Sequence, residues 1–206
     1  MKYQQLVDAP CNARLAQTTA PASEPRDVVE LKQHIRQDIS DEDDYLGSLI
    51  SASRQWIEMY LGRQLITATW TLTLDAFPAD GVMELPRPPL LTVASVKYYD
   101  VARVQQTFAA SGYHTHVFAG PEAGPGRIEL APGTAWPTVY SGEGAVQIAF
   151  TAGYGATGST VPPQIRQAIL LHAAEMYERR EQVIVGAIST PVAVTVERLL
   201  WPLRVF

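Results

Sequence analysis

The chain has little of several things that would point to particular classes of protein. It contains one cysteine, Cys11, in 206 residues, so no disulfide can form within the chain and the sequence fits a reducing compartment. No apolar run approaches the length of a membrane span, and the N-terminus lacks an apolar signal core. We therefore expect a soluble protein that is made inside a cell and does not contact a membrane.

Clustered positive charge is also missing. The net charge is −5 and no run of Lys or Arg occurs. We therefore do not expect sequence-independent binding of nucleic acid to be the main function of this surface. A ring that merely surrounds DNA can still be this acidic, because it needs only weak attraction. The chain is 47% hydrophobic, which is enough to bury a core of one or two domains.

The motifs of catalysis and metal binding are incomplete. His114 and His116 share one face of a predicted strand, but no third ligand at matching spacing completes a metal site. His172 lies on the apolar face of a predicted helix without a nucleophile, so we predict a buried, hydrogen-bonded histidine. The glycine-rich stretch 153–160 lacks the Lys-Ser/Thr of a phosphate-binding loop. The sequence thus predicts no catalytic residue, no cofactor and no metal.

Residues 1–25 have little periodicity and predict a mobile N-terminal arm. Ser23 or Glu24, followed by Pro25, is typical of the start of a helix, which we expect to reach about residue 37.

Two longer amphipathic helices are predicted. Ser40 is the expected N-cap of the first, and Gly62 is well placed as the residue that ends it. The second begins at residues 161–163 and runs to about Glu181.

Between these helices the period of the apolar residues switches to two. Residues 65–74 alternate as in a strand with one apolar face, and turn residues separate further short strands. The predicted fold class is α+β: a helical bundle from both chain ends (26–64 and 160–206) with an inserted antiparallel β lobe (65–159), either one sheet or a small sandwich. The further strands are expected at Val82–Leu85, Val93–Tyr99, Gln105–Phe108, Tyr113–Phe118, Arg127–Leu130 and Ala145–Thr151.

The chain ends in an apolar segment that includes Trp, Arg and Phe, residue types enriched at the hot spots of interfaces. Two interpretations stay open: the segment folds back on its own core, or it binds a partner. Both hold if part of it docks internally and the rest reaches outward. The candidate partner-binding residues are Leu199, Leu200, Trp201, Leu203, Arg204, Val205 and Phe206.

At this point the chain, from about residue 26 to its end, resembles a known family: the head–tail connector (adaptor or head-completion) proteins of tailed bacteriophages and related prophage elements. The resemblance depends on the order and spacing of several short segments. These are residues 31–36, 40–46, 57–67, 85–90, 125–128, 150–155, 161–162, 177–178 and 200–206.

The resemblance implies a structural protein of the virion at the head–tail interface, made in the cytoplasm of the bacterial host. Such connectors form a ring, typically of twelve copies, beneath the portal protein, and they extend the DNA channel toward a stopper or tail-completion protein. Packaged DNA would pass through without sequence-specific binding. The helical bundle would form the body of the ring, the C-terminal segment would contact the portal, and the β lobe would face outward or tailward.

A closed ring needs two different faces of each subunit. The acidic start of the long helix and the basic end of the later helix offer opposite charges. The candidate subunit-interface residues are therefore Asp41, Asp43, Asp44, Arg179 and Arg180.

A second hypothesis is a β lobe that binds a ligand or carbohydrate on stacking aromatics. Trp70, Trp136 and Tyr140 would supply that surface and would have to be exposed. An enzyme is disfavoured, because no nucleophile–base pair or metal-binding set is present in the sequence.

Overall fold

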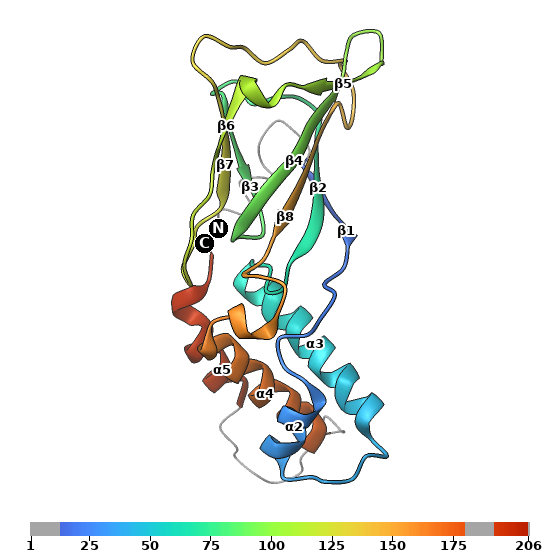
Figure 1. Ribbon diagram of the computed structural model, residues 1–206, viewed down its shortest axis with the longest axis vertical. Coiled ribbons are helices and arrows are strands. Elements are labelled where there is room, and N and C mark those ends of the chain that lie inside the picture. Colours follow the sequence, from blue (N-terminus) through green and yellow to red (C-terminus); the bar gives the residue numbers. More distant parts are fainter. Residues whose placement is uncertain (1–12, 180–191, 206) are drawn as a thin grey trace.

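The computed structural model describes residues 13–179 and 192–205, and its mixed α+β content confirms the predicted class. The molecule is elongated, with the helices gathered at one end and the strands at the other (Figure 1). None of the helices within the described ranges is long and apolar enough to cross a membrane. The elements in chain order are β1 (Arg14–Thr19), α2 (Val28–Ile35), α3 (Asp43–Leu61), β2 (Ala68–Leu74), β3 (Val82–Leu85), β4 (Leu90–Tyr99), β5 (Gln105–Phe108), η1 (Ala110–Gly112), β6 (Tyr113–His116), β7 (Gly126–Leu130), β8 (Val146–Ala152), η2 (Gly158–Thr160), α4 (Pro163–Glu178), α5 (Val192–Leu200) and η3 (Trp201–Leu203).

The strands form two antiparallel sheets. One has five strands in the order β1-β2-β8-β4-β5, and the other has three in the order β3-β7-β6. Burial alternates strictly along β2, with its alanine, tryptophan and leucines inward and its threonines toward the surface, which confirms the predicted apolar face. Apolar side chains of both sheets, among them Met83, Ile128, Ile148 and Phe150, make up one hydrophobic cluster.

Strand β1 corrects the prediction of a mobile arm over residues 1–25. Residues 14–19 pair with β2, from Arg14 opposite Thr73 to Thr19 opposite Thr69. The sheet is therefore not built from residues 65–159 alone, because its first edge strand comes from before the helices. The strand is exposed apart from half-buried Leu15, so backbone pairing holds it and no apolar periodicity predicts it. Residues 1–12, including Cys11, lie outside the described residues.

The predicted start of the first helix and the predicted N-cap of the second are both wrong. Helix α2 is capped by Asp27, whose Oδ1 accepts from the Glu30 amide at 2.8 Å while the Glu30 carboxylate accepts from the Asp27 amide at 3.2 Å. This is a complete capping box, and it lies three residues after the expected start. At α3 the N-cap is Glu42, with no side-chain cap, and Ser40 contributes only its carbonyl to the Asp43 amide. Gly62 ends α3 with φ +68°, as predicted.

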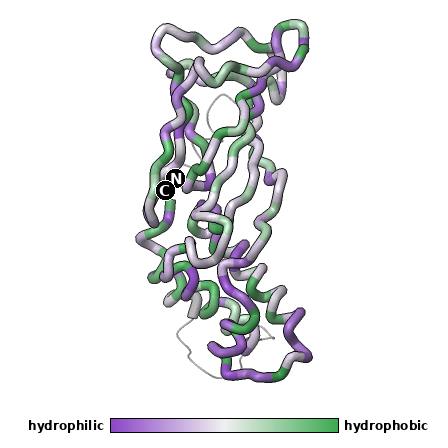
Figure 2. The backbone as a smooth tube through the Cα atoms, in the orientation of Figure 1, coloured by the Kyte–Doolittle hydropathy of each residue, from purple (hydrophilic) through white to green (hydrophobic). Residues whose placement is uncertain are grey.

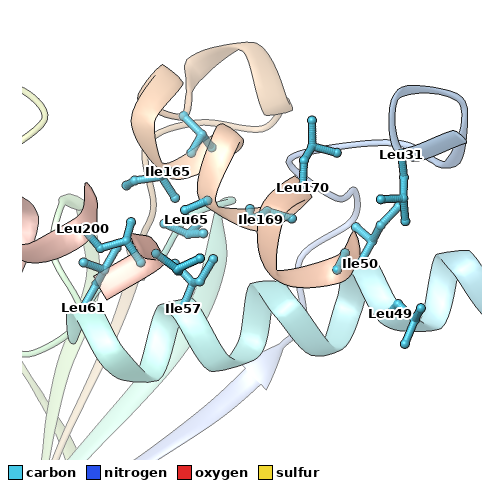
Figure 3. Close-up of a cluster of buried hydrophobic side chains, with 14 of the residues drawn as sticks. Leu31, Leu49, Ile50, Ile57, Leu61, Leu65, Ile165, Ile169, Leu170 and Leu200 are labelled. Carbon is cyan, nitrogen blue, oxygen red and sulfur yellow. The ribbon is translucent and has the colours of Figure 1, made fainter. Parts of the chain in front are cut away.

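The helices share a second hydrophobic cluster. Side chains from α2, α3, α4 and α5 converge between α3 and α4, with Ile57 and Leu61 of α3 near Ile169 and Leu200 (Figure 3). Leu65, just after α3, completes the cluster and is fully buried. Each such side chain stabilises the fold by roughly 1.5–3 kcal/mol, so packing rather than capping holds α3 in place.

A network of ion pairs involves two buried charged residues of α3, Arg54 and Glu58. Arg54 donates to Glu58 at 2.8 Å, one turn later in the helix, and to Glu24 of the preceding segment at 2.7 Å. Burial raises the pKa of the Glu58 carboxyl, and the Arg54 guanidinium opposes that rise. Removing either partner of the Arg54–Glu58 pair would leave the other one buried and uncompensated.

The same network continues into the sheet. Glu58 Oε1 accepts from the Gln64 side chain at 2.7 Å and from the Leu65 amide at 3.0 Å, and Gln64 in turn accepts from the Trp70 indole at 3.1 Å. Arg87, at φ +63°, donates to the Glu58 carbonyl and lies over the Trp70 ring. The end of α3 is thus fixed to the start of β2 by hydrogen bonds between buried groups.

Candidate functional site

The C-terminal segment, residues 199–205, is the strongest candidate for a binding surface, and much of it docks on its own core. Leu200 is fully buried and Leu203 is 2% exposed. The Val205 amide donates to the Leu61 carbonyl at 3.0 Å, and Val205 packs over Gly62 at the end of α3. These leucines are unavailable to a partner without unfolding, which makes them structural residues in this chain.

Other side chains of the segment point outward. Trp201 is 56% exposed, and Arg204 is exposed with its guanidinium 5.0 Å from the centroid of the Tyr60 ring and 6.0 Å from that of Trp201. Tyr60 stacks on Trp56 of α3 at 5.4 Å. The C-terminal segment therefore presents an aromatic surface with one cation on it. Phe206, the last candidate, lies outside the described residues.

Arg63 holds the C-terminal segment against the loop between β6 and β7. Its side chain is buried, and it donates to the Leu203 carbonyl through Nε and to the Ala123 carbonyl through Nη1. Burial lowers the pKa of the Arg63 guanidinium, while Tyr154 and Glu122 act in the opposite direction. Nothing in the spacing around Arg63 marks it, since both acceptors are backbone groups far away in the sequence.

The charged candidates for a subunit interface gather at one end of the helices. Asp41 and Asp44 are exposed, whereas Asp43 pairs with Lys32 at 2.9 Å and Arg179 pairs with Glu175 at 3.2 Å. The chain that leads from α2 into α3 is markedly hydrophilic (Figure 2).

The end of α4 lies beside the start of α3, because the Tyr177 hydroxyl donates to Glu42 at 2.6 Å. The acidic set and the end of α4 that carries Arg179 are therefore close to each other within one subunit. Arg180 lies outside the described residues.

His172 and His116 both contact other side chains of the fold. His172 is partly buried, its Nδ1 lies 3.1 Å from the Ser53 hydroxyl, and its ring stacks on Trp56 at 4.6 Å, so the predicted hydrogen bond is confirmed. Burial lowers the pKa of His172. His116 lies 3.0 Å from Glu129 on the neighbouring strand. Within residues 13–179 and 192–205, no group of three or more His, Cys, Asp or Glu side chains is arranged to hold a metal ion.

The stacking surface that a ligand-binding β lobe would need is not formed. Trp70 is 9% exposed and has its indole hydrogen bonded to Gln64. Trp136 is stacked on Phe77 at 4.5 Å between ring centroids, and Tyr140 lies beneath the Arg103 guanidinium. None of the three aromatics is exposed as this hypothesis requires, because Trp70 is buried and Trp136 and Tyr140 are half-buried.

Comparison with known proteins agrees with the resemblance seen in the sequence. Residues 26–114 match the model of a family described as phage gp6-like head-tail connector protein. Among curated proteins, none is significantly similar to the chain.

Among the solved structures similar to this chain are three from gene transfer agent particles, two of them from the neck. A chain from the neck of an empty particle, computed with C6 symmetry, is 30% identical, with a TM-score of 0.74 over 94% of this chain and 96% of the other. A chain from the virion of a native particle is 31% identical, with a TM-score of 0.73 over 93% and 95%. A third, from a native neck computed with C12 symmetry, is 30% identical, with a TM-score of 0.72 over 94% and 96%.

Proposed function

The chain belongs to the phage gp6-like head–tail connector family, and from that membership we propose that it forms a ring beneath the portal of a phage-like particle. Its role is that of a structural connector, not an enzyme. The observation that carries the proposal is the match over nearly the whole length of both chains, at 30% identity, to a component of a particle neck. In this proposal the protein is made in the host cytoplasm and ends in the virion.

The ring is proposed to have twelve copies, in keeping with the C12 symmetry of one similar neck. The helical layer would form its body, with the sheets projecting outward or toward the tail. Closure requires a heterologous contact between two different faces. We propose Asp41 and Asp44 for one of those faces, because both are exposed. Asp43 and Arg179 already have partners within the chain and would contribute less.

The portal contact is proposed at the outward side of the C-terminal segment. Trp201 and Arg204 are exposed there, while Leu200 and Leu203 hold the segment in position from below. An aromatic residue and an arginine on a firmly docked backbone lose little conformational entropy on binding, which favours affinity. The β end of the molecule, far from the helices in Figure 1, would then be available to a stopper or tail-completion protein.

The acidic surface suits a channel through which DNA slides. The net charge is −5 and the chain has no run of Lys or Arg, so its surface would neutralise few DNA phosphates. DNA would therefore pass through the ring without being held. Binding of duplex DNA to the isolated protein at physiological salt is accordingly expected to be undetectable.

The portal contact can be tested with purified protein and a portal ring of the same particle. We expect the mixture to show a complex by light scattering, with a ring visible by electron microscopy on one end of the portal. Trp201→Ser should weaken this complex at least about tenfold, as expected for a hot-spot residue. Val101→Ser is the matched control, because Val101 is 72% exposed on the β4–β5 hairpin.

Equal affinity of the Trp201→Ser variant and the wild-type protein would contradict the portal assignment. Failure of the wild-type protein to join the portal at all would contradict the connector function proposed for this chain. Point substitution is preferable to truncation before Leu199, because truncation would also remove two buried leucines.

A further inference from the structure

The loop between β6 and β7, residues 117–125, shares an anchoring residue with the C-terminal segment. Arg63 donates to a carbonyl in each, to Ala123 of the loop and to Leu203 of the segment. In Figure 1 this loop descends from the sheets to the C-terminal segment, although the two are far apart in the sequence. A change in the position of one would therefore displace the other.

The loop is fixed at further points despite having no regular structure. The Tyr154 hydroxyl donates to the Pro121 carbonyl at 2.6 Å, and the Ala123 amide donates to the Gly120 carbonyl at 3.2 Å. Ala123 itself is buried at 6% exposure. The loop is consequently preorganised, and a partner that binds it does not have to order it first.

This fixed loop displays apolar side chains to solvent. Val117 is 50% exposed and Phe118 is 43% exposed, in a stretch that contributes nothing to either hydrophobic cluster. Large apolar residues exposed together on a preorganised segment are typical of interaction sites.

We propose that Val117 and Phe118 form, with Trp201 and Arg204, one composite docking surface for the portal, with Arg63 as the positioning residue between its two halves. This inference rests on the proposed portal contact and extends it to a loop that the sequence did not mark. The partner surface that fits is apolar at its centre, to cover the aromatic and aliphatic side chains.

Continuity with the C-terminal segment is the reason for choosing the portal over a neighbouring copy of this chain. Through Arg63, the loop is fixed to the backbone of the same segment that carries Trp201 and Arg204. The exposed aliphatics of the β4–β5 hairpin, Val101 and Val104, have no such link to that segment and provide a matched control.

The test compares two double variants of the full-length protein, Val117→Ser with Phe118→Ser, and Val101→Ser with Val104→Ser. Both replace exposed apolar side chains, so both should fold and melt like the wild-type protein. The loop variant should bind the portal at least about tenfold more weakly, whereas the hairpin variant should bind it as the wild-type protein does. Tyr154→Phe removes the hydroxyl that donates to the Pro121 carbonyl and that also interacts with the Arg63 side chain, so it should weaken portal binding severalfold while the protein stays folded.

Two results would overturn the composite surface while leaving the proposed function intact. One is normal portal binding by the loop variant or by Tyr154→Phe under conditions where Trp201→Ser fails to bind. The other is loss of ring formation by the loop variant in the absence of portal, which would assign the loop to a second copy of the chain. If Trp201→Ser also binds normally, the portal contact itself is refuted.

Discussion

Replacing Leu203 and Trp201 separately by alanine tests whether one short segment both docks internally and presents a surface. Leu203 is 2% exposed and Trp201 is 56% exposed, although they are two residues apart. If the interpretation is correct, the two substitutions affect different properties of the protein.

The expected magnitudes follow from burial. Removing a fully buried leucine side chain destabilises a protein by about 2–5 kcal/mol, since the lost apolar burial is added to the cost of a cavity. At about 2–4 °C per kcal/mol for a chain of this length, a loss of about 3 kcal/mol lowers the melting temperature by about 6–12 °C. Trp201→Ala changes a mainly exposed side chain and should cost less than about 1 kcal/mol.

The assay pairs thermal unfolding with portal binding at a temperature where both variants are folded. Leu203→Ala should melt early, whereas Trp201→Ala should melt normally and bind the portal weakly. An unchanged melting temperature for Leu203→Ala would refute the internal docking of the segment. An equal drop for both variants would show that Trp201 belongs to the core.

Three further predictions concern the folded chain itself. Arg54→Met leaves the Glu58 carboxylate buried without its ion-pair partner and should lower the unfolding free energy by about 3–5 kcal/mol in a guanidinium titration; a change below about 1 kcal/mol would contradict it. Burial lowers the pKa of His172, so the folded protein resists protonation there; stability is fully present above the unfolded value of 6.5 and is lost as the pH falls through the depressed folded pKa. In a plot of the urea unfolding midpoint against pH, His172→Gln should reduce the fall below pH 6.5. An unchanged curve would exclude His172 as the cause of that fall. Gly153→Ala would bring a Cβ within 2.6 Å of the Thr67 amide nitrogen at φ +137°, so it should lower the melting temperature clearly, whereas Gly124→Ala, with open space around it, should not.

Much of the fold could be predicted because its apolar residues follow simple periods. The alternation along β2 and the i, i+3/i+4 pattern of α3 are both visible in the sequence and correspond to burial in the structure. The glycine at the end of α3 was predictable for the same local reason, since a left-handed backbone favours that residue.

Strand β1 and the helix starts were not predictable in the same way. An exposed edge strand has no apolar pattern, and it forms because β2 offers it free backbone groups. Helix α2 starts later than Ser23 or Glu24 because the capping box of Asp27 with Glu30 satisfies two backbone N–H donors at once, each accepted by a carboxylate.

The candidate surface was predictable only in part. The residue types of the C-terminal segment indicate an interface, and Trp201 is indeed exposed. Which leucines point inward depends on contacts with α3 and with Arg63, whose acceptors are backbone carbonyls without any signature of residue type. The position of the β6–β7 loop depends on the same long-range contacts.

The separation of α3 from α4 along the chain has a consequence for biosynthesis. Helix α3 ends at Leu61, but the helix that covers it begins only at Pro163, after all strands of the described ranges have been made. Contacts between such distant stretches form late, because the intervening chain has to close into a loop first. A nascent or prematurely terminated polypeptide therefore lacks α4 and the C-terminal segment, and with them half of the proposed docking surface.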